Sequence, residues 1–337
     1  MTRPSRTQLK FYRSIVVMSA AASAPYGYFD AIARGGSGAT GLVRGAVIGI
    51  LISVPLGAVN LLVLDGLFRD QIRRIPLALN FVLRTCLYAA LIVVGLALGP
   101  VIVPGGASGI QFGSVVFAVA LSLLFNVLGG INQLLGLRVL VQFVSGRYHR
   151  PRVEERVLLF VDLESSTQIA ERLGELRFLD FLNRFIGDVT DAIVAEGGAI
   201  HKYVGDEVIA EWPAGDGAAA GAVRACFAAM ETLARRQAIY EAEFGAAANF
   251  RAGIHVGPVV LGELGYSRME IAFLGDTMNT AARIHELCRE TGNRVIASDA
   301  LLALAGSLPP GIEKRALGPV ALRGKERALE LYALAAR

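Results

Sequence analysis

The sequence predicts an α/β (α+β) domain with a ferredoxin-like βαββαβ layout, preceded by an all-α transmembrane bundle of four helices. The chain has 337 residues, 54% of them hydrophobic, and its mean hydropathy of +0.51 is too high for an ordinary soluble protein. Charge is placed unevenly, because no Asp, Glu, Lys or Arg lies between Arg84 and Arg138, whereas the sequence after Arg150 is densely charged. In that charged half, short apolar runs alternate with segments of helical periodicity. A membrane half followed by a soluble half accounts for these observations.

Four apolar segments fill the membrane half, and each is long enough to cross a bilayer. The first is rich in Ala and Ser and is interrupted by Pro25, so it is the weakest. Basic residues mark the N-terminus, the second loop and the stretch after the fourth span, so the positive-inside rule places both termini and the soluble domain in the cytoplasm, at the cell (inner) membrane. The expected parts are a cytoplasmic N-terminus at 1–14, a transmembrane domain at 15–135 with spans at about 15–33, 43–64, 85–103 and 113–135, a helical and basic linker at 136–152, and the soluble domain at 153–337.

Polar side chains within the expected spans have two interpretations. Asn60, Asn126, Asn132 and Gln133 could form a ligand or signal site, or they could form hydrogen bonds between helices. The second interpretation is favoured, because small and amide residues commonly hold such bundles together.

Composition limits the partners and the compartment. The net charge is only +4, and the basic residues cluster beside apolar segments, which indicates a lipid bilayer as partner and no nucleic acid. Cys86, Cys226 and Cys288 show neither metal-ligand spacing nor a disulfide framework. A soluble part in the reducing cytosol is therefore expected.

The soluble domain is expected to begin with a central strand at 157–161, because five apolar residues are too few for a buried helix. Gly205 and Asp206 are predicted to form a tight turn between two strands. The order of the elements predicts one antiparallel sheet with helices on one face. The remaining elements are expected as a helical region around 178–193, strands at 199–204 and 207–212, a helix at 216–243, strands at 250–255, 259–263 and 269–274, a helix at 276–288, and short strands at 295–296, 316–321 and 329–332.

A carboxylate stands at the end of the central strand, and hydroxyl residues follow it. Asp162 ends the apolar run, and Ser165, Ser166 or Thr167 can cap the helix expected next. Backbone N–H groups at a helix N-terminus bind phosphate, and a carboxylate holds the cation that neutralises it. The alternative is that Asp162 is only a turn or capping residue. The downstream motifs decide between the two.

Three further motifs follow Phe160-x-Asp162 along the chain. Two aspartates at neighbouring strand ends can hold a pair of Mg²⁺ or Mn²⁺ ions, with substrate phosphates completing the shell. An amide and a guanidinium four residues apart on one helix face suit a developing negative charge on a phosphoryl group. The motifs are Lys202-x-x-Gly205-Asp206, Gly253-Ile254-His255-x-Gly257-Pro258-Val259 and Gly275-Asp276-x-x-Asn279-x-Ala281-x-Arg283.

In the order and internal spacing of these motifs, the chain resembles the catalytic domain of class III nucleotidyl cyclases, in particular bacterial membrane-bound adenylate cyclases. The resemblance covers about residues 155–334. It implies conversion of ATP to 3′,5′-cyclic AMP and pyrophosphate, with two Mg²⁺ or Mn²⁺ ions per active site. Asp162 and Asp206 would then be the metal ligands, with the Leu163 backbone carbonyl as a further ligand. The turn that cradles the triphosphate would run from Phe160 through Leu163, Ser165 and Ser166 to Thr167.

The same resemblance implies roles for the later residues. Lys202 would read the purine edge, beside Ala272 and Phe273. Asn279 and Arg283 would be the catalytic pair that orients the ribose and stabilises the transition state. Either Arg323 or Lys325 would contact the terminal phosphate. Because sites of this family form between two domains and this chain has both halves, the resemblance implies a head-to-tail homodimer with two equivalent sites.

Two positions depart from the family pattern. Ser165 stands where the family turn usually has Gly, and Ala272 stands where adenylate cyclases usually have an Asp or Thr that accepts a hydrogen bond from the adenine amine. Two alternatives therefore stay open: a membrane sensor or assembly module with a catalytically degenerate cyclase domain, and a guanylate cyclase of relaxed base specificity. The intact Asp162, Asp206, Asn279 and Arg283 favour the active adenylate cyclase.

Overall fold

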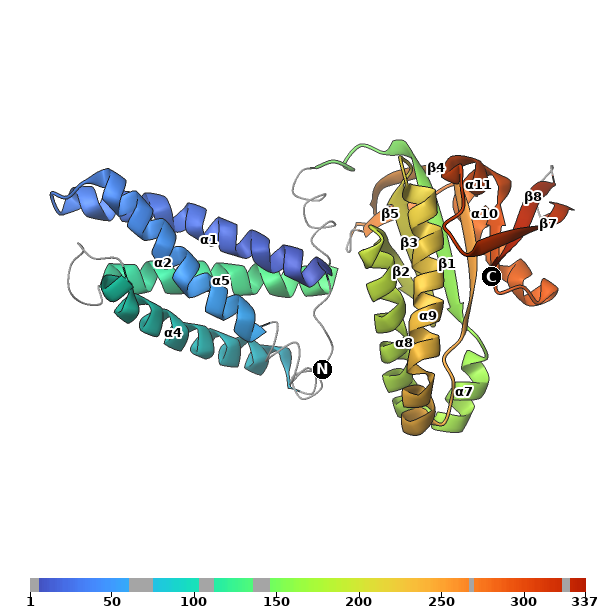
Figure 1. The fold of residues 1–337 in the computed structure, drawn as a ribbon, viewed down its shortest axis with the longest axis horizontal. Helices are drawn as coiled ribbons and strands as arrows, with labels where there is room; N and C mark the ends of the chain where they lie inside the picture. Colours follow the sequence, from blue (N-terminus) through green and yellow to red (C-terminus); the bar gives the residue numbers. More distant parts are fainter. Residues whose placement is uncertain (1–5, 61–74, 103–111, 136–145, 267–269, 323–327) are drawn as a thin grey trace. The chain divides into compact units, whose positions relative to one another are not determined.

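The computed structural model describes residues 6–60, 75–102, 112–135, 146–266, 270–322 and 328–337 (Figure 1). The chain divides into two compact units, Met1–Val141 and Gln142–Arg337. In the described residues the first unit is helical, and all strands belong to the second.

The described part of the first unit consists of the helices α1 (Arg6–Ala33), α2 (Gly38–Ala58), α4 (Leu77–Ile102) and α5 (Phe112–Leu135). Three stretches of the described chain are long and apolar enough to cross a membrane: Gly38–Ala58, Leu79–Ala97 and Phe112–Gly129. The weak span expected at 15–33 lies within α1, which is not among the three. The described residues thus give three candidate spans where the sequence predicted four.

Helices α1 and α2 approach each other closely through small residues. Gly41 and Gly45 are buried on α2, one helical turn apart. A Cβ atom on Gly45 would lie 2.2 Å from the backbone oxygen of Ser23, and one on Gly41 would lie 2.4 Å from the backbone oxygen of Gly27. Side chains are therefore excluded at this crossing, and backbone-to-backbone contact stabilises the helix pair.

Polar side chains of the helical unit form hydrogen bonds between helices. Ser19 donates to the backbone oxygen of Gly49 over 3.2 Å, and the Asn60 amide contacts the Tyr88 hydroxyl. Asn126 donates to the Thr85 hydroxyl over 3.3 Å. For Asn60 and Asn126 this agrees with the interpretation as interhelical hydrogen bonding, whereas the side chains of Asn132 and Gln133 lie outside the described residues.

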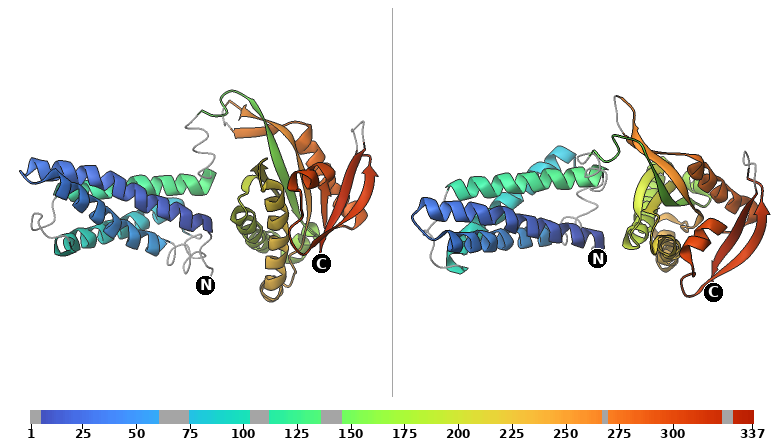
Figure 2. Two further views of the ribbon diagram at one scale, coloured as in Figure 1. Left: turned by 45° about the horizontal axis from the view of Figure 1, so that its top comes forward. Right: turned by 90° about the horizontal axis from the view of Figure 1, so that it is seen from above.

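A mixed sheet with the strand order β2-β3-β1-β4-β6-β8-β7 forms the second unit, and β5 pairs with β4 beside this path (Figure 2). β1 lies between β3 and β4 and is antiparallel to both, while β4 and β6 are parallel. The expectation of a purely antiparallel sheet is therefore wrong. The strands are β1 (Arg152–Leu163), β2 (Ala199–Val204), β3 (Glu207–Pro213), β4 (Phe250–Leu264), β5 (Glu270–Leu274), β6 (Val295–Ser298), β7 (Ile312–Val320) and β8 (Leu329–Ala336). The helices are α7 (Ser166–Leu173), α8 (Glu175–Ala195), α9 (Ala218–Phe244), α10 (Asp276–Thr291) and α11 (Asp299–Ala305).

One expected element is divided in the structure, and two others are joined. The first helical region is divided into α7 and α8 at Gly174, which has a φ of 74° that favours glycine. The two strands expected on either side of Gly257 form the single strand β4, because Pro258 continues the extended backbone and lies opposite Glu155 of β1. Helix α11 was not expected from the sequence.

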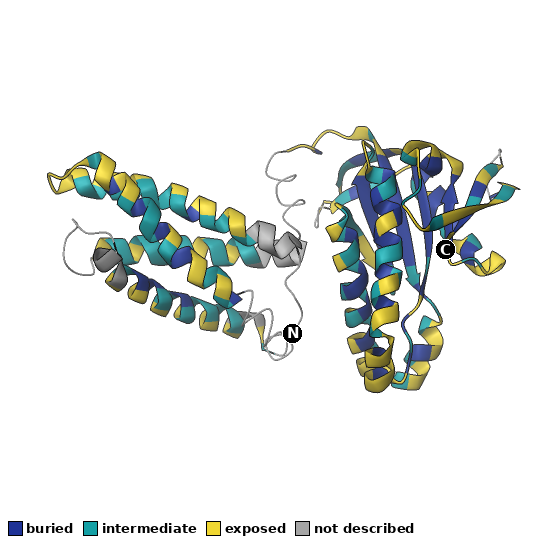
Figure 3. Ribbon diagram, viewed as in Figure 1, coloured by how far each residue is buried: buried dark blue, intermediate teal, exposed yellow. Residues whose placement is uncertain are grey.

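The sheet carries a different cover on each face. Val157, Leu159 and Val161 of β1 point into a core formed with α8 and α9, which lie side by side along that face. Leu158 and Phe160 point the other way, into a smaller core with residues of β5 and α10. Figure 3 shows the central strands buried between these two layers, while α8 and α9 expose their outer sides. The expectation that helices cover only one face of the sheet is therefore wrong.

Glycines on β4 explain how α10 reaches the second face. Gly253 and Gly257 alternate with Ile254 and Val256, so they point away from the α8 and α9 side. A Cβ atom on Gly253 would lie 2.6 Å from the backbone nitrogen of His285 on α10. The absence of side chains lets α10 lie directly on the sheet.

Candidate active site

The two predicted metal-binding aspartates meet at the carboxyl end of β1. In the ladders, Asp162 lies opposite Glu207 of β3 and opposite Arg251 of β4. Asp206 lies in the turn between β2 and β3, which needs the left-handed conformation that Gly205 adopts with a φ of 63°. The turn brings the Asp206 carboxyl close enough to the Asp162 carboxyl for the two groups to interact.

This pair carries more negative charge than its surroundings balance. Burial, and then the neighbouring Asp206 carboxyl, raise the pKa of Asp162 to about 7, although Arg251 acts in the opposite direction. Burial and the charges of Asp206 and Glu286 likewise raise the pKa of Glu207 to about 7. A cation beside these carboxylates would relieve the repulsion.

The donor set of the pair fits a hard divalent cation. Asp162 and Asp206 offer only oxygen, which is the ligand type of Mg²⁺ and Mn²⁺. Within the described residues no group of three or more His, Cys, Asp and Glu side chains could hold a metal ion. Leu163 can offer only its backbone carbonyl, since its side chain is buried in the core under α8 and α9.

The turn after Asp162 takes an unusual backbone conformation. Ser165 has a φ of 58°, and it is the one residue other than glycine with a positive φ in the described chain. This conformation explains why glycine suits this position. Of the three hydroxyl residues that could cap α7, Ser165 stands at the N-cap position but makes no side-chain capping hydrogen bond. Its hydroxyl therefore does not occupy the N–H groups in the first turn of the helix. Such N–H groups can bind an anion.

The residues expected to read the purine lie together on β2 and β5. The Lys202 ammonium is 3.3 Å from a carboxylate oxygen of Glu270, and both side chains are about half exposed. The ring of Phe273 stacks on the ring of His201 with a centroid separation of 4.0 Å. Burial, and then the Lys202 charge, lower the pKa of His201 to about 4, so His201 is neutral at pH 7. Ala272 is 8% exposed between Glu270 and Leu274.

The other predicted residues lie on α10, in the smaller core or outside the described residues. Asn279 is exposed and Arg283 half-buried on α10, whose buried side is formed by Thr280, Ala281 and Ile284. Among the described residues, no hydrogen bond or ion pair joins Asn279 or Arg283 to Asp162 or Asp206. The Phe160 side chain is buried in the smaller core. Arg323 and Lys325 lie outside the described residues.

All the described site residues fall within a segment that matches a known family. A family model described as the adenylate and guanylate cyclase catalytic domain matches residues 149–336. The chain belongs to this family. The matched segment begins just before β1 and ends at the last residue of β8.

Similar proteins include named adenylate cyclases. Adenylate cyclase 2 of Rhizobium meliloti (strain 1021) is 35% identical over 209 residues, which are 61% of this chain and 57% of that protein. The adenylate cyclase of Anabaena cylindrica is 28% identical over 181 residues, 52% of this chain and 36% of that protein. The chain thus spans little more than half the length of the first relative and about a third of the second.

Solved structures share the cyclase fold. A bacterial light-regulated adenylyl cyclase has a TM-score of 0.56 at 21% identity, covering 66% of this chain and 65% of that chain. The adenylyl cyclase CyaB from P. aeruginosa has a TM-score of 0.50 at 22% identity, covering 56% of this chain and 97% of that chain. These likenesses establish the fold alone.

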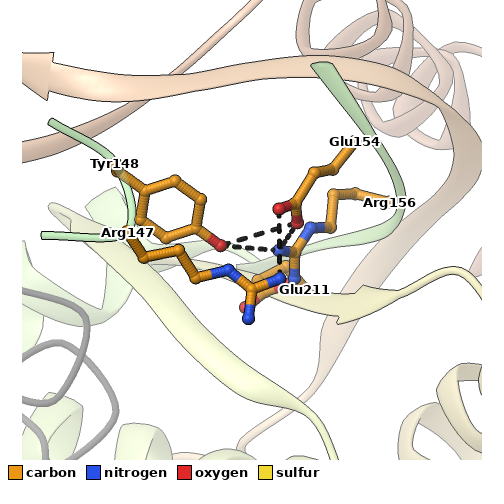
Figure 4. A network of polar contacts seen from close by, with 5 residues as sticks. All are labelled: Arg147, Tyr148, Glu154, Arg156 and Glu211. Atoms are coloured by element: carbon orange, nitrogen blue, oxygen red, sulfur yellow. Dashed lines mark hydrogen bonds and ion pairs between the residues drawn. The ribbon is translucent and has the colours of Figure 1, made fainter. Parts of the chain in front are cut away.

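Sequence reasoning missed a charged cluster on the face of the cyclase domain that carries Asp162. Arg156 of β1 is 3% exposed; its guanidinium lies 2.5 Å from Glu211, contacts Glu154, and donates to the Tyr148 hydroxyl over 3.1 Å (Figure 4). The same guanidinium lies 5.9 Å from the centroid of the Phe273 ring. Arg156 therefore joins β1, β3, β5 and the segment before β1.

Alternation along β1 was the available signal for this cluster. Arg156, Leu158, Phe160 and Asp162 occupy every second position and so share a face. Charged residues at both ends of that series indicate a polar, functional face. The partner of Lys202 had no such signal, because Glu270 is 68 residues away in the sequence.

Proposed function

We propose that the protein is a membrane-bound adenylate cyclase that converts ATP to 3′,5′-cyclic AMP and pyrophosphate. The observation that carries this proposal is the close pair of Asp162 and Asp206, whose mutual repulsion suits a site for cations and phosphates. Membership of the cyclase family and the resemblance to named adenylate cyclases support the choice of reaction.

In this proposal Asp162, Asp206 and the Leu163 carbonyl hold two Mg²⁺ or Mn²⁺ ions. The ions supply charge that neutralises the triphosphate and favours ionisation of the ribose 3′-hydroxyl. The backbone N–H groups at the start of α7, between Ser165 and Thr167, hold the phosphates. The bond between the 3′-oxygen and the α-phosphorus forms as the bond to the pyrophosphate oxygen breaks, and the hydroxyl proton passes to solvent.

Arg283 and Asn279 complete the site from a second copy of the chain. Both stand on α10 away from its buried side, and neither contacts the aspartates of its own chain within the described residues. A head-to-tail homodimer would bring the α10 of one subunit to the aspartates of the other, twice. Arg283 would then stabilise the charge that develops on the α-phosphoryl group, while Asn279 would orient the ribose.

The membrane arrangement belongs to the same proposal. Three described helices are apolar enough to span a bilayer, and α1 would serve as a fourth, weaker span. Four spans from residue 15 to residue 135 would place the N-terminus and the cyclase domain together in the cytoplasm, joined by the basic segment at 136–152. In a dimer this arrangement holds two cyclase domains at a high effective concentration.

Purified full-length protein with Mn²⁺ and ATP tests the reaction. Wild-type protein is expected to form cyclic AMP, and Asp162→Ala or Asp206→Ala to form less than about one thousandth as much, because each change removes a ligand. Near-normal activity in either variant would refute the metal assignment. The same assay with GTP decides whether the chain is instead a guanylate cyclase of relaxed base specificity, an alternative left open because Ala272 offers no acceptor for the adenine amine.

A further inference from the structure

The ion pair between Lys202 and Glu270 has a counterpart in the purine ring that the proposed function brings to this site. Lys202 is on β2 and Glu270 on β5, and the ammonium lies 3.3 and 3.4 Å from the two carboxylate oxygens. An ammonium only donates hydrogen bonds and a carboxylate only accepts them. The pair therefore presents one donor and one acceptor side by side.

The fold holds these two groups next to the Ala272 position. Side chains alternate along a strand, so Glu270 and Ala272 share one face of β5, roughly 6.6 Å apart. The stack of Phe273 on His201 fixes β5 beside the part of β2 that carries Lys202. Neutral His201 does not compete with Lys202 for the carboxylate.

The pair is also accessible and weak enough to open. The side chains of Lys202 and Glu270 are 50% and 47% exposed, and ion pairs of such exposure contribute little to stability. A purine edge can therefore replace the direct contact without a large loss.

We propose that Glu270 is a specificity-determining residue of the cyclase site, which accepts a hydrogen bond from the amino group at position 6 of adenine while Lys202 donates to ring nitrogen N1. The assignment rests on the proposed function. Guanine presents a carbonyl oxygen at position 6, which the carboxylate repels, and an N1–H group, which faces the Lys202 donor. Glu270 thus supplies the hydrogen-bond acceptor that Ala272 lacks, and it selects ATP over GTP.

A comparison of three nucleotides in the full-length protein tests this role. The readout is kcat/KM with Mn²⁺ for ATP, for GTP and for purine riboside triphosphate, which lacks the amino group at position 6. Glu270→Ala should lower kcat/KM for ATP about tenfold, as expected for loss of a hydrogen bond to a charged group. The same variant should keep kcat/KM for purine riboside triphosphate within about twofold of the wild-type value. The ratio of kcat/KM for ATP to kcat/KM for GTP should fall at least tenfold. Glu270→Gln, which keeps an acceptor oxygen, should regain part of the loss.

Glu243→Ala is the matched control. Glu243 is on α9, is 48% exposed and pairs with Arg184, so its environment resembles that of Glu270 without the neighbouring β2 and β5 residues. The Glu243→Ala variant should leave all three kcat/KM values unchanged. If Glu270→Ala lowers kcat/KM for ATP and for purine riboside triphosphate equally, the inference is wrong. It is also wrong if Glu270→Ala, like Glu243→Ala, changes none of the three values. In both cases the proposed formation of cyclic AMP is unaffected. If wild-type protein forms no cyclic nucleotide, the proposed function fails first.

Discussion

The two faces of β1 differ in what they contribute to the protein. Toward α8 and α9 the strand presents Val157, Leu159 and Val161, which lie in the larger core. Toward β5 and α10 it presents Leu158 and Phe160 between two charged residues, Arg156 and Asp162. Apolar burial contributes to folding at about 25 cal/mol per Å², whereas burial of charges costs free energy unless each is paired.

This difference shows where the fold accepts a cost for function. Nothing about the stability of a central strand requires a carboxylate beside a second carboxylate, as Asp162 is beside Asp206. The polar face instead places charged groups at fixed positions on a rigid strand, with the first face supplying the stability. Mutations on the two faces should therefore have separable effects.

The largest expected effect on stability is at Arg156. Arg156→Ala should lower the free energy of unfolding by about 3–5 kcal/mol, because the buried carboxylate of Glu211 loses the cation that pairs with it. Trp212 is the single tryptophan and is buried in the larger core, so its fluorescence reports unfolding of the cyclase domain in urea.

Two controls separate charge from packing at this position. The double change Arg156→Met with Glu211→Leu should regain most of the stability, because both charges of this buried pair are removed together. Leu159→Ala, on the other face, should lose about 2–5 kcal/mol through a cavity while leaving the KM for ATP unchanged. A loss below about 1 kcal/mol in Arg156→Ala would show that the cluster does not stabilise the fold.

A pH effect is expected at Asp162. Its folded-state pKa of about 7 exceeds the ordinary value of 3.8, so the folded chain keeps a proton that the unfolded chain releases. Its contribution to stability is fully present below pH 4 and is lost as the pH rises through 7. Without metal, Asp162→Asn should therefore gain stability over wild type between pH 5 and pH 8, on the order of 1–2 kcal/mol after allowance for solvent screening.

Urea unfolding in the presence of a chelator, at several pH values, measures this difference. Addition of Mg²⁺ or Mn²⁺ should reverse it, because only wild type keeps both carboxylates for the cation. A difference between the two proteins that does not change with pH would contradict the repulsion between Asp162 and Asp206.

The smallest expected effect is at the turn after β1. Ser165 holds a left-handed backbone with a φ of 58°, which costs a residue with a Cβ atom about 1 kcal/mol. Ser165→Gly should therefore raise the free energy of unfolding by up to about 1 kcal/mol and retain activity. A decrease in stability of that size would show that the Ser165 side chain contributes contacts that outweigh the strain.

Much of the cyclase domain could be predicted from sequence because its signals are local. The apolar run that ends at Asp162 lies within β1, and the Gly205–Asp206 turn joins β2 to β3 as expected. The Asp162 and Asp206 pairing follows from those two predictions, since β3 lies beside β1.

Features that depend on distant residues could not be predicted. The contact of Lys202 with Glu270 requires β5 to lie beside β2, although β5 pairs with β4 among the described strands of the sheet. The parallel pairing of β4 and β6 and the position of α10 on the second face depend on packing, for which Gly253 gave only an ambiguous signal. The terminal-phosphate residue, Arg323 or Lys325, stays a prediction.

Complementation between two inactive chains tests most directly whether the polar face of β1 forms an active site shared by two subunits. Full-length Asp162→Ala and Arg283→Ala are each expected to form almost no cyclic AMP from ATP with Mn²⁺. When the two are coexpressed and the heterodimer is purified with two different affinity tags, one of its two sites contains both intact halves. The account predicts recovery of up to about half the wild-type activity per dimer. A purified heterodimer that remains as inactive as its parents would contradict it.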